Sequence, residues 1–375
     1  MMIESHGEVC RLGYLRLIVA AAKSESARDQ ASQSFLASIL EESVKKLKEP
    51  PASQVDAVGL IRSTVAARNY VSLAADLNLL SKKSPTLGEN GIVYAFTRSI
   101  AHSEAFLRGE AELSLLDVIT LKPVERLFFF WLLVVNDYLV LPSIIRWVLE
   151  TESFSRLEAM NYVMEDLYPQ ALQSILAAAG KRAQSELLPK LEAAQRYREE
   201  RLKYSRKAEW IRSSLYAKYR HIVPPRLEWL VDLGLLRRVK RGRYDVSDQV
   251  LGHKALFLKT LSYPPSKITE QIFSTLAPVM IQYAGKASRE ALNKELINTF
   301  NAISTYLGGP VKIRLLELAV CIRLLENNQV ATPSQIRETI NKLSVLYPDK
   351  IYLVPGPDDN LYLSRINLSP KELAL

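Results

Sequence analysis

Residues 219–248, with the sequence YRHIVPPRLEWLVDLGLLRRVKRGRYDVSD, constrain the fold more than any other stretch of the chain. The Pro-Pro pair at 224–225 suits the first turn of a helix, and Gly234 provides a stop at which a positive φ is tolerated. Two β-prone runs, 235–239 and 243–246, then flank a Lys-Arg-Gly turn. The pattern predicts a short helix followed by a tight hairpin.

A looser form of this pattern occurs in the N-terminal part of the chain, at about 55–110. Residues 55–66 and 70–80 have the apolar spacing of two successive helices. The β-prone run IVYAF at 92–96 follows two glycines, which predicts a hairpin there.

A third form lies at the C-terminus. Residues 311–326 are predicted to form a helix, and Thr332-Pro333 to begin another, with Thr332 as its N-cap. The segment KIYLVPGPDDNLYLSRI at 350–366 is predicted to be a hairpin with an acidic tip. This module is a candidate surface for a homodimer or a protein partner.

A strongly apolar helical block, 113–168, connects the modules. Its longest unbroken run, LFFFWLLVV at 127–135, ends at Asn136-Asp137, and Arg146 follows soon after. A membrane-spanning helix needs about 20 mostly apolar residues without such charges. We therefore predict a buried helical hairpin and no membrane partner.

Positive charge is concentrated in one part of the chain. Residues 181–243 contain 18 Lys or Arg against 7 Asp or Glu, a local excess of +11. Because the net charge of the whole chain is +9, the other 312 residues sum to −2. Such a concentration is typical of polyanion binding, in which each cation placed on a phosphate releases a condensed counterion. Within it, 186–220 is predicted to be one long helix, either continuous or broken in the middle, whose inner stripe is Tyr204, Ala208, Ile211 and Leu215.

The residues from Arg226 to Leu236, followed by the basic strand–turn–strand that closes at Tyr244-Asp245-Val246, resemble the winged helix-turn-helix superfamily. The resemblance implies a mainly α fold with small β-hairpins, in which two or three winged-helix-like modules are joined by helical linkers. It also implies that the helix ending in LGLL is offered to the DNA major groove and that the hairpin is the wing. The expected domains are 1–112, 113–185, 186–262 and 263–375.

One departure from the superfamily lies on that helix. If its Leu and Val side chains face inward, its outward arc holds Pro225, Glu228 and Asp232. Two carboxylates there oppose phosphate, so we expect affinity from the wing and the preceding helix rather than base reading. The candidate phosphate contacts in the wing are Arg237, Arg238, Lys240, Arg241 and Arg243. The flanking candidates are Arg206, Lys207, Arg212, Lys218, Arg220 and Arg226, with Lys82 and Lys83 in the first module.

The sequence contains no recognisable catalytic or cofactor motif, so we expect no enzyme activity, no cofactor and no metal. The four histidines lack zinc-ligand spacing, and the glycine-rich motifs that hold nucleotides do not occur. The two cysteines form neither a metal pair nor a disulfide framework, which favours a reducing compartment: the cytoplasm, the nucleoid or a nucleus.

The expected function is therefore the binding of nucleic acid, above all duplex DNA, as a transcriptional regulator or a DNA-anchoring subunit. One alternative is a scaffold or adaptor whose winged helices bind an acidic protein partner. Another is RNA binding, although the tyrosines and tryptophan of the basic stretch are spaced for core packing and not as a stacking platform.

Overall fold

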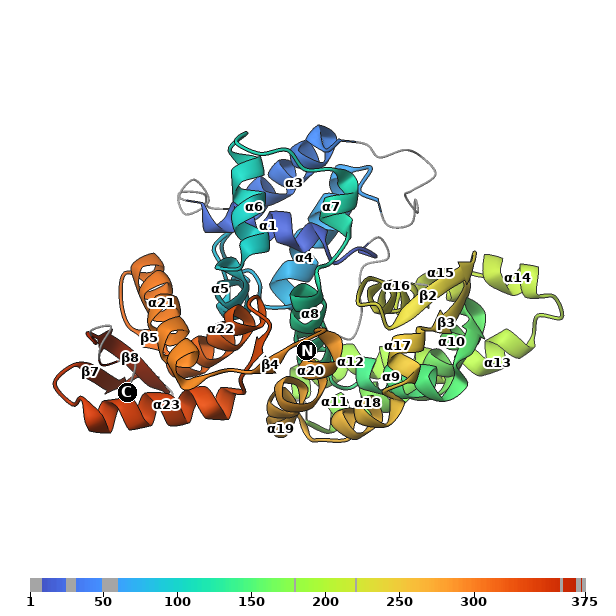
Figure 1. The fold of residues 1–375 in the computed structure, drawn as a ribbon. Coiled ribbons are helices and arrows are strands. Elements are labelled where there is room, and N and C mark those ends of the chain that lie inside the picture. The colour runs from blue at the N-terminus through green and yellow to red at the C-terminus, as the bar shows by residue number, and fades with distance from the viewer. Residues whose placement is uncertain are drawn as a thin grey trace. The chain divides into compact units, whose positions relative to one another are not determined.

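A computed structural model describes residues 9–24, 32–48, 60–178, 180–219, 221–357, 360–368 and 372. These residues form two compact units that alternate along the chain. The first unit comprises 1–12, 56–61 and 133–261, and the second comprises 13–55, 62–132 and 262–375. Both are mainly helical, as the sequence predicted, with a few small sheets (Figure 1).

In the first unit, the longest segment is 133–261. It contains α9 (Leu141–Thr151), β1 (Ser153–Ser155) and α10 (Arg156–Tyr162). A capping box, in which Ser155 and Glu158 satisfy each other's backbone amides, fixes the start of α10. The segments that follow are the π-helical η1 (Val163–Leu167), α11 (Tyr168–Ala178), α12 (Lys181–Gln195), α13 (Tyr197–Leu202), α14 (Lys207–Arg212) and α15 (Ser214–Tyr219).

The inner stripe expected for a helix over 186–220 is wrong. Tyr204 and Ile211 are 38% and 40% exposed. The buried aromatic side chains are instead Tyr197, Trp210 and Tyr219, with ring centroids of Tyr197 and Trp210 5.0 Å apart. Because the chain leaves the helix after Leu202 and again after Arg212, residues at helical spacing across those breaks do not share a face.

The predicted helix and hairpin at 224–246 are confirmed as α16 (Pro224–Asp232), β2 (Leu236–Lys240) and β3 (Arg243–Val246). Gly234 ends the helix with a φ of 75°. The antiparallel sheet has the order β1-β3-β2, so the central strand is the last in sequence. Two short helices, α17 (Asp248–Leu251) and α18 (Lys254–Leu261), complete the unit.

The N-terminal half of the second unit is helical, and the hairpin expected at 92–96 is wrong. That run lies in α5 (Glu89–Ala95), where a Cβ on Gly91 would stand 2.0 Å from the carbonyl oxygen of Leu79. The glycine therefore permits close packing and does not mark a turn. The other helices of this half are α1 (Tyr14–Lys23), α3 (Ser34–Lys46), α4 (Thr64–Asp76), α6 (Arg98–Leu107) and α7 (Leu115–Ile119).

The two helices expected at 55–66 and 70–80 are replaced by the single helix α4. Ser63 caps it by accepting a hydrogen bond from the Ala66 amide, which places the helix start later than predicted. Residues 55–59 of the first expected helix lie outside the described part of the chain.

The C-terminal half of the second unit contains the predicted helix–helix–hairpin pattern. Its elements are α19 (Pro265–Gln271), η2 (Ile272–Leu276), α20 (Ala277–Met280), β4 (Gly285–Lys286), α21 (Arg289–Leu307), β5 (Val311–Lys312), α22 (Ile313–Leu325), β6 (Gln329–Val330), α23 (Pro333–Leu346), β7 (Ile351–Pro355) and β8 (Leu361–Ile366). Thr332 is the N-cap of α23, as expected. The order β5-β8-β7 again places the last strand in the middle (Figure 1).

The apolar block forms α8 (Pro123–Asn136), which begins at the predicted proline, and α9, with a bend of 117° between them. Among the described residues no single helix is long and apolar enough to cross a membrane, although α8 and α9 taken together reach that length. In the second unit, Phe128 at the start of α8 is fully buried and stacks on Tyr94 with ring centroids 4.6 Å apart.

Candidate nucleic-acid interface

The hairpin of β2 and β3 carries an exposed cationic end. Lys240 pairs with Arg243 across the strands, and only Arg241 and Gly242 separate them. Gly242 has a φ of 72°, which permits so short a turn. The side chains of Lys240, Arg241 and Arg243 are all exposed, and we call these three residues the basic tip.

The basic tip keeps its charge largely unpaired. Neither Lys240 nor Arg241 has an ion-pair partner in the described part of the chain. The guanidinium of Arg243 donates a 3.4 Å hydrogen bond to the hydroxyl oxygen of Ser153, an uncharged group. The tip therefore presents donors that a phosphate can accept.

The exposed carboxylate of Glu158 interacts with two of the candidate cations. The pKa of Glu158 is lowered, first by hydrogen bonds from Ser155 and then by the positive charges of Arg243 and Lys207. The structure brings three of the candidates named from the sequence, Lys240, Arg241 and Arg243, together on one turn.

Arg237 belongs to this surface but its charge is compensated. It stands opposite Asp245 in the sheet, and its guanidinium lies 3.6 Å from a carboxylate oxygen of Asp248. The Arg237 side chain is 59% exposed. An exposed pair of this kind contributes little to stability, so Arg237 can still reach a phosphate, with a smaller net gain.

Arg238 points the other way, into a buried cluster around Glu228. Its side chain is only 13% exposed and forms an ion pair with that carboxylate. Glu228 also accepts hydrogen bonds from the Tyr244 hydroxyl, at 2.6 Å, and from Arg156, at 3.2 Å. Burial raises the pKa of Glu228, and the hydrogen bond from Tyr244 opposes that rise. Arg238 therefore holds the hairpin on α16 and does not serve as a phosphate contact.

Arg226, expected to flank the interface, is fully buried. Its Nε lies 2.7 Å from Asp137 Oδ2 and its Nη2 3.1 Å from Asp137 Oδ1, and both side chains have an exposed fraction of zero. Nη1 donates to the carbonyl oxygen of Ile222. Arg226 is buried because its guanidinium neutralises the carboxylate of Asp137, which lies inside the unit in the turn after α8.

The outward arc expected on α16 is also wrong. Pro225, Glu228 and Asp232 are all buried. The N-terminal segment covers part of the helix: Trp229 donates to the carbonyl oxygen of Val9 at 2.6 Å, and Arg11 lies 2.8 Å from Asp232. The amide of Leu12 donates to Asp232 at 2.8 Å. Removal from water raises the pKa of Asp232 to about 6, although Arg11 lowers it.

The remaining flanking candidates are scattered along the helices before α16. Arg206 is 81% exposed and lies 3.9 Å from Glu209, and Arg212 is exposed. Lys218 lies in α15, but its side chain is outside the described part of the structure. Arg220 lies wholly outside the described part.

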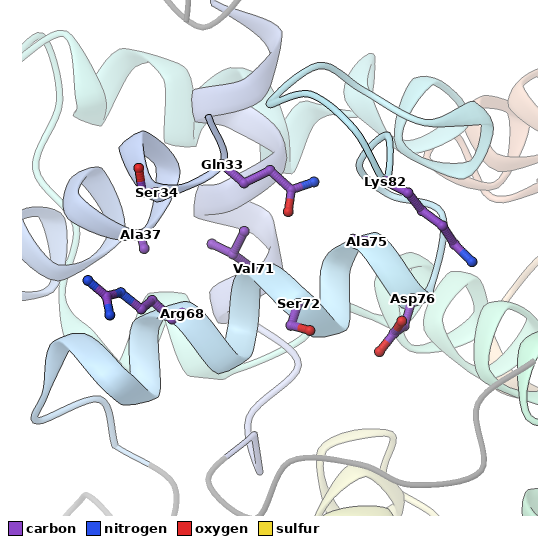
Figure 2. Close-up of a pocket in the computed structure, with 9 residues that line it drawn as sticks. All are labelled: Gln33, Ser34, Ala37, Arg68, Val71, Ser72, Ala75, Asp76 and Lys82. Carbon is purple, nitrogen blue, oxygen red and sulfur yellow. The ribbon is translucent and has the colours of Figure 1, made fainter. Parts of the chain in front are cut away.

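Lys82 and Lys83 lie in the other unit, in the loop after α4, and both are exposed. An isolated antiparallel bridge between Leu80 and Leu87 closes this loop, and no longer strand flanks the two lysines. Lys82 instead lines a groove of about 450 Å³ between α3 and α4, with Arg68 at its other end and Val71 between them (Figure 2).

Among the described residues no group of three or more His, Cys, Asp or Glu side chains is placed to hold a metal ion. Comparisons with protein-family models, with curated proteins and with solved structures give no match to the chain.

Proposed function

We propose that this protein binds duplex DNA through the basic tip, which acts as the wing of a winged-helix module in a regulator or a DNA-anchoring subunit. The observation that carries the proposal is the tip itself: three exposed cations on one tight turn. The short turn keeps the backbones of the three cations close together, so their charges act on the same stretch of a phosphate backbone.

The order of elements supports the winged-helix interpretation. In the first unit, α9, β1, α10, α16, β2 and β3 follow the order helix–strand–helix–helix–strand–strand, with additional helices between α10 and α16. In the second unit, α21, β5, α22, α23, β7 and β8 follow the same order, with the two-residue strand β6 between α22 and α23. Both sheets place the first strand beside the third.

The mode of binding at the tip is contact with the sugar-phosphate backbone. Lysine and arginine contacts to phosphate supply affinity that is independent of sequence and falls steeply with salt. Because α16 is buried along its length, it cannot place side chains on base edges in a groove. The tip therefore anchors the protein without selecting a sequence.

The test is a triple variant, Lys240→Ser, Arg241→Ser and Arg243→Ser. Each phosphate contact contributes about 0.9 to the slope of log K against log salt for duplex DNA. Losing three contacts should reduce that slope by about 2.7 and weaken binding to every duplex sequence alike. Fluorescence anisotropy with duplexes of unrelated sequence, at several salt concentrations, measures both effects.

A matched control removes the same charge elsewhere in the basic stretch. Arg196, Arg198 and Lys203 are well exposed, and each lies within 4 Å of a glutamate. Replacing these three by Ser should leave the salt slope almost unchanged, because their charges are already compensated. Equal losses in the two triple variants, or none in the first, would show that the tip is not the binding surface.

The alternative of an acidic protein partner has one observation in its favour: Val239, next to the tip, is 55% exposed. An apolar side chain ringed by charges suits a protein interface. In that case a stoichiometric partner copurifies after nuclease treatment and is lost in the tip variant, while duplex DNA does not compete for it.

A further inference from the structure

A groove on the second unit has the size and the lining of a small-molecule site. It lies between α3 and α4 and has a volume of about 450 Å³ (Figure 2). Sites that hold small molecules have volumes of roughly 300–1,000 Å³ and combine an apolar lining with a few polar groups. The basic tip belongs to the other unit, so the groove is a different surface.

The floor of the groove is apolar, and short side chains leave it open. Ala37 on α3 and Val71 on α4 are 2% and 3% exposed. Ala75, one turn after Val71, is half-buried. Ser34 and Ser72 also line the groove, and their side chains are too short to fill it. A ligand that rests on this floor removes apolar surface from water, which favours binding.

One end of the groove carries the guanidinium of Arg68. This residue lies one turn before Val71 and Ser72, so the three share a face of α4. Arg68 is exposed, and its side chain has neither an ion-pair nor a hydrogen-bond partner among the described residues. A guanidinium binds a carboxylate through two parallel hydrogen bonds. This end therefore suits the carboxylate of a ligand.

The opposite end offers both donors and acceptors. Lys82 is exposed and has no ion-pair partner in the part of the chain that the structure describes. Asp76 lines the same end, which is therefore mixed in charge (Figure 2). Gln33 donates from Nε2 to the carbonyl oxygens of Ser81, at 2.6 Å, and Ser84, at 3.4 Å. Its Oε1 accepts no hydrogen bond from a described residue. A neutral group that both donates and accepts, such as a hydroxyl, suits this end better than a second carboxylate.

Backbone contacts place the loop that carries Lys82 beside the groove. The amide of Ser81 donates to the carbonyl oxygen of Thr86 at 2.9 Å, and an antiparallel bridge joins Leu80 to Leu87. The side chain of Gln33, at the N-cap of α3, ties the same loop to that helix. The backbone of Lys82 therefore starts from a defined point at the end of the groove.

We propose that the groove binds a small amphiphilic carboxylic acid, with its carboxylate on Arg68, its apolar body on Val71 and Ala75, and a distal hydroxyl at the end that carries Lys82. Asp76 follows Arg68 by eight residues, which is about 12 Å along the helix axis. An extended aliphatic chain of medium length spans that distance. The proposal is independent of the proposed DNA binding.

The experiment is isothermal titration calorimetry of the full chain with decanoate and with ω-hydroxydecanoate. Both acids should bind, the hydroxy acid more tightly, and decyltrimethylammonium should not. Arg68→Gln keeps a polar side chain but removes the charge, so it should weaken the binding of both acids about 10- to 100-fold. The matched control is Arg62→Gln, at an exposed arginine before α4 that does not line the groove. It should bind both acids as the wild type does.

Two further variants test the far end and the floor. Lys82→Met removes the ammonium and keeps the stem, so the preference for the hydroxy acid should fall about 3- to 10-fold. Lys83→Met, at the exposed neighbour that does not line the groove, is its control. Ala75→Leu places a good helix former in the groove and should abolish the binding of both acids. Thermal unfolding of each variant shows that it is folded.

Several results would overturn the proposal. They are no heat of binding from either acid with the wild type, equal losses in Arg68→Gln and Arg62→Gln, and full affinity in Ala75→Leu. Binding of decyltrimethylammonium as tight as that of decanoate would show that the groove takes apolar chains without recognising a carboxylate. Equal affinities for the two acids would remove the hydroxyl from the account. None of these results depends on whether the protein binds DNA.

Discussion

The buried pair of Arg226 and Asp137 allows a quantitative test of the fold around the hairpin. In Arg226→Met the aliphatic stem remains, so the main loss is the partner of a fully buried carboxylate, which accepts two hydrogen bonds from the guanidinium at 2.7 and 3.1 Å. Breaking a buried pair by removing one side costs about 3–5 kcal/mol. We expect the upper part of this range, because the Ile222 carbonyl oxygen also loses its donor.

The measurement is urea unfolding followed by tryptophan fluorescence, since Trp147, Trp210 and Trp229 all lie in the same unit as the pair. The matched control is Arg206→Met, at a side chain that is 81% exposed, and it should cost less than about 0.5 kcal/mol. A cost for Arg226→Met no larger than that of the control would refute the reasoning.

A second variant separates the charge from the packing. Burial already raises the pKa of Asp137, while Arg226 lowers it. In Arg226→Met that lowering is lost, so the folded-state pKa rises further above its unfolded value. The loss of unfolding free energy is then present at neutral pH, where the carboxyl of Asp137 must be charged, and it becomes smaller as the pH falls and the carboxyl is protonated. Adding Asp137→Asn to Arg226→Met should recover at least about 2 kcal/mol at pH 7, because an unpaired amide costs less than an unpaired charge.

Two other predictions concern buried titratable groups. The pKa of Asp232 is raised from 3.8 to about 6. The contribution of this raised pKa to stability is therefore complete below pH 4 and is lost as the pH rises through 6. Between pH 4 and 7 the free energy of unfolding of the wild type should fall by up to about 3 kcal/mol relative to that of Asp232→Asn. Parallel pH profiles would contradict this. Burial raises the pKa of Cys10 to about 12 and also raises that of Cys321 well above its usual value, so neither thiol should react with a thiol reagent at pH 8 until the protein is unfolded. Rapid labelling of the native protein would show that one of them is accessible.

Local signals in the sequence located the hairpins at 236–246 and 351–366. The glycines at 234 and 242 require positive φ, and the structure has both. Thr332 followed by Pro333 fixed the start of α23 through a capping box. These features depend on residues a few positions apart, and such short-range chemistry is visible in a sequence.

The predictions that failed concern features that depend on contacts between distant segments of the chain. Whether Asp232 faces water depends on Arg11 and Leu12, about 220 residues away, and Glu228 is covered by Arg156, Arg238 and Tyr244. Nothing in α16 itself indicates that cover. The strand β1 is three residues long and is defined by pairing with β3, some 90 residues later. At 92–96 the β-prone residues IVYAF form a helix, because tertiary packing around Gly91 overrides a weak local preference.

The same long-range contacts explain why the helices that precede the two hairpins differ in the side chains they expose. In α16 the polar side chains are engaged inside the unit: Arg226 by Asp137, Asp232 by Arg11, and Glu228 by the hairpin. The basic tip lies on the turn beyond β2, and cations on such a turn suit phosphate rather than base edges. In α23 a buried carboxylate, Glu317, holds Arg337 while the side chain of Arg337 stays 57% exposed. The two helices therefore differ in whether their polar side chains are buried or reach solvent, although they occupy the same position in the order of elements.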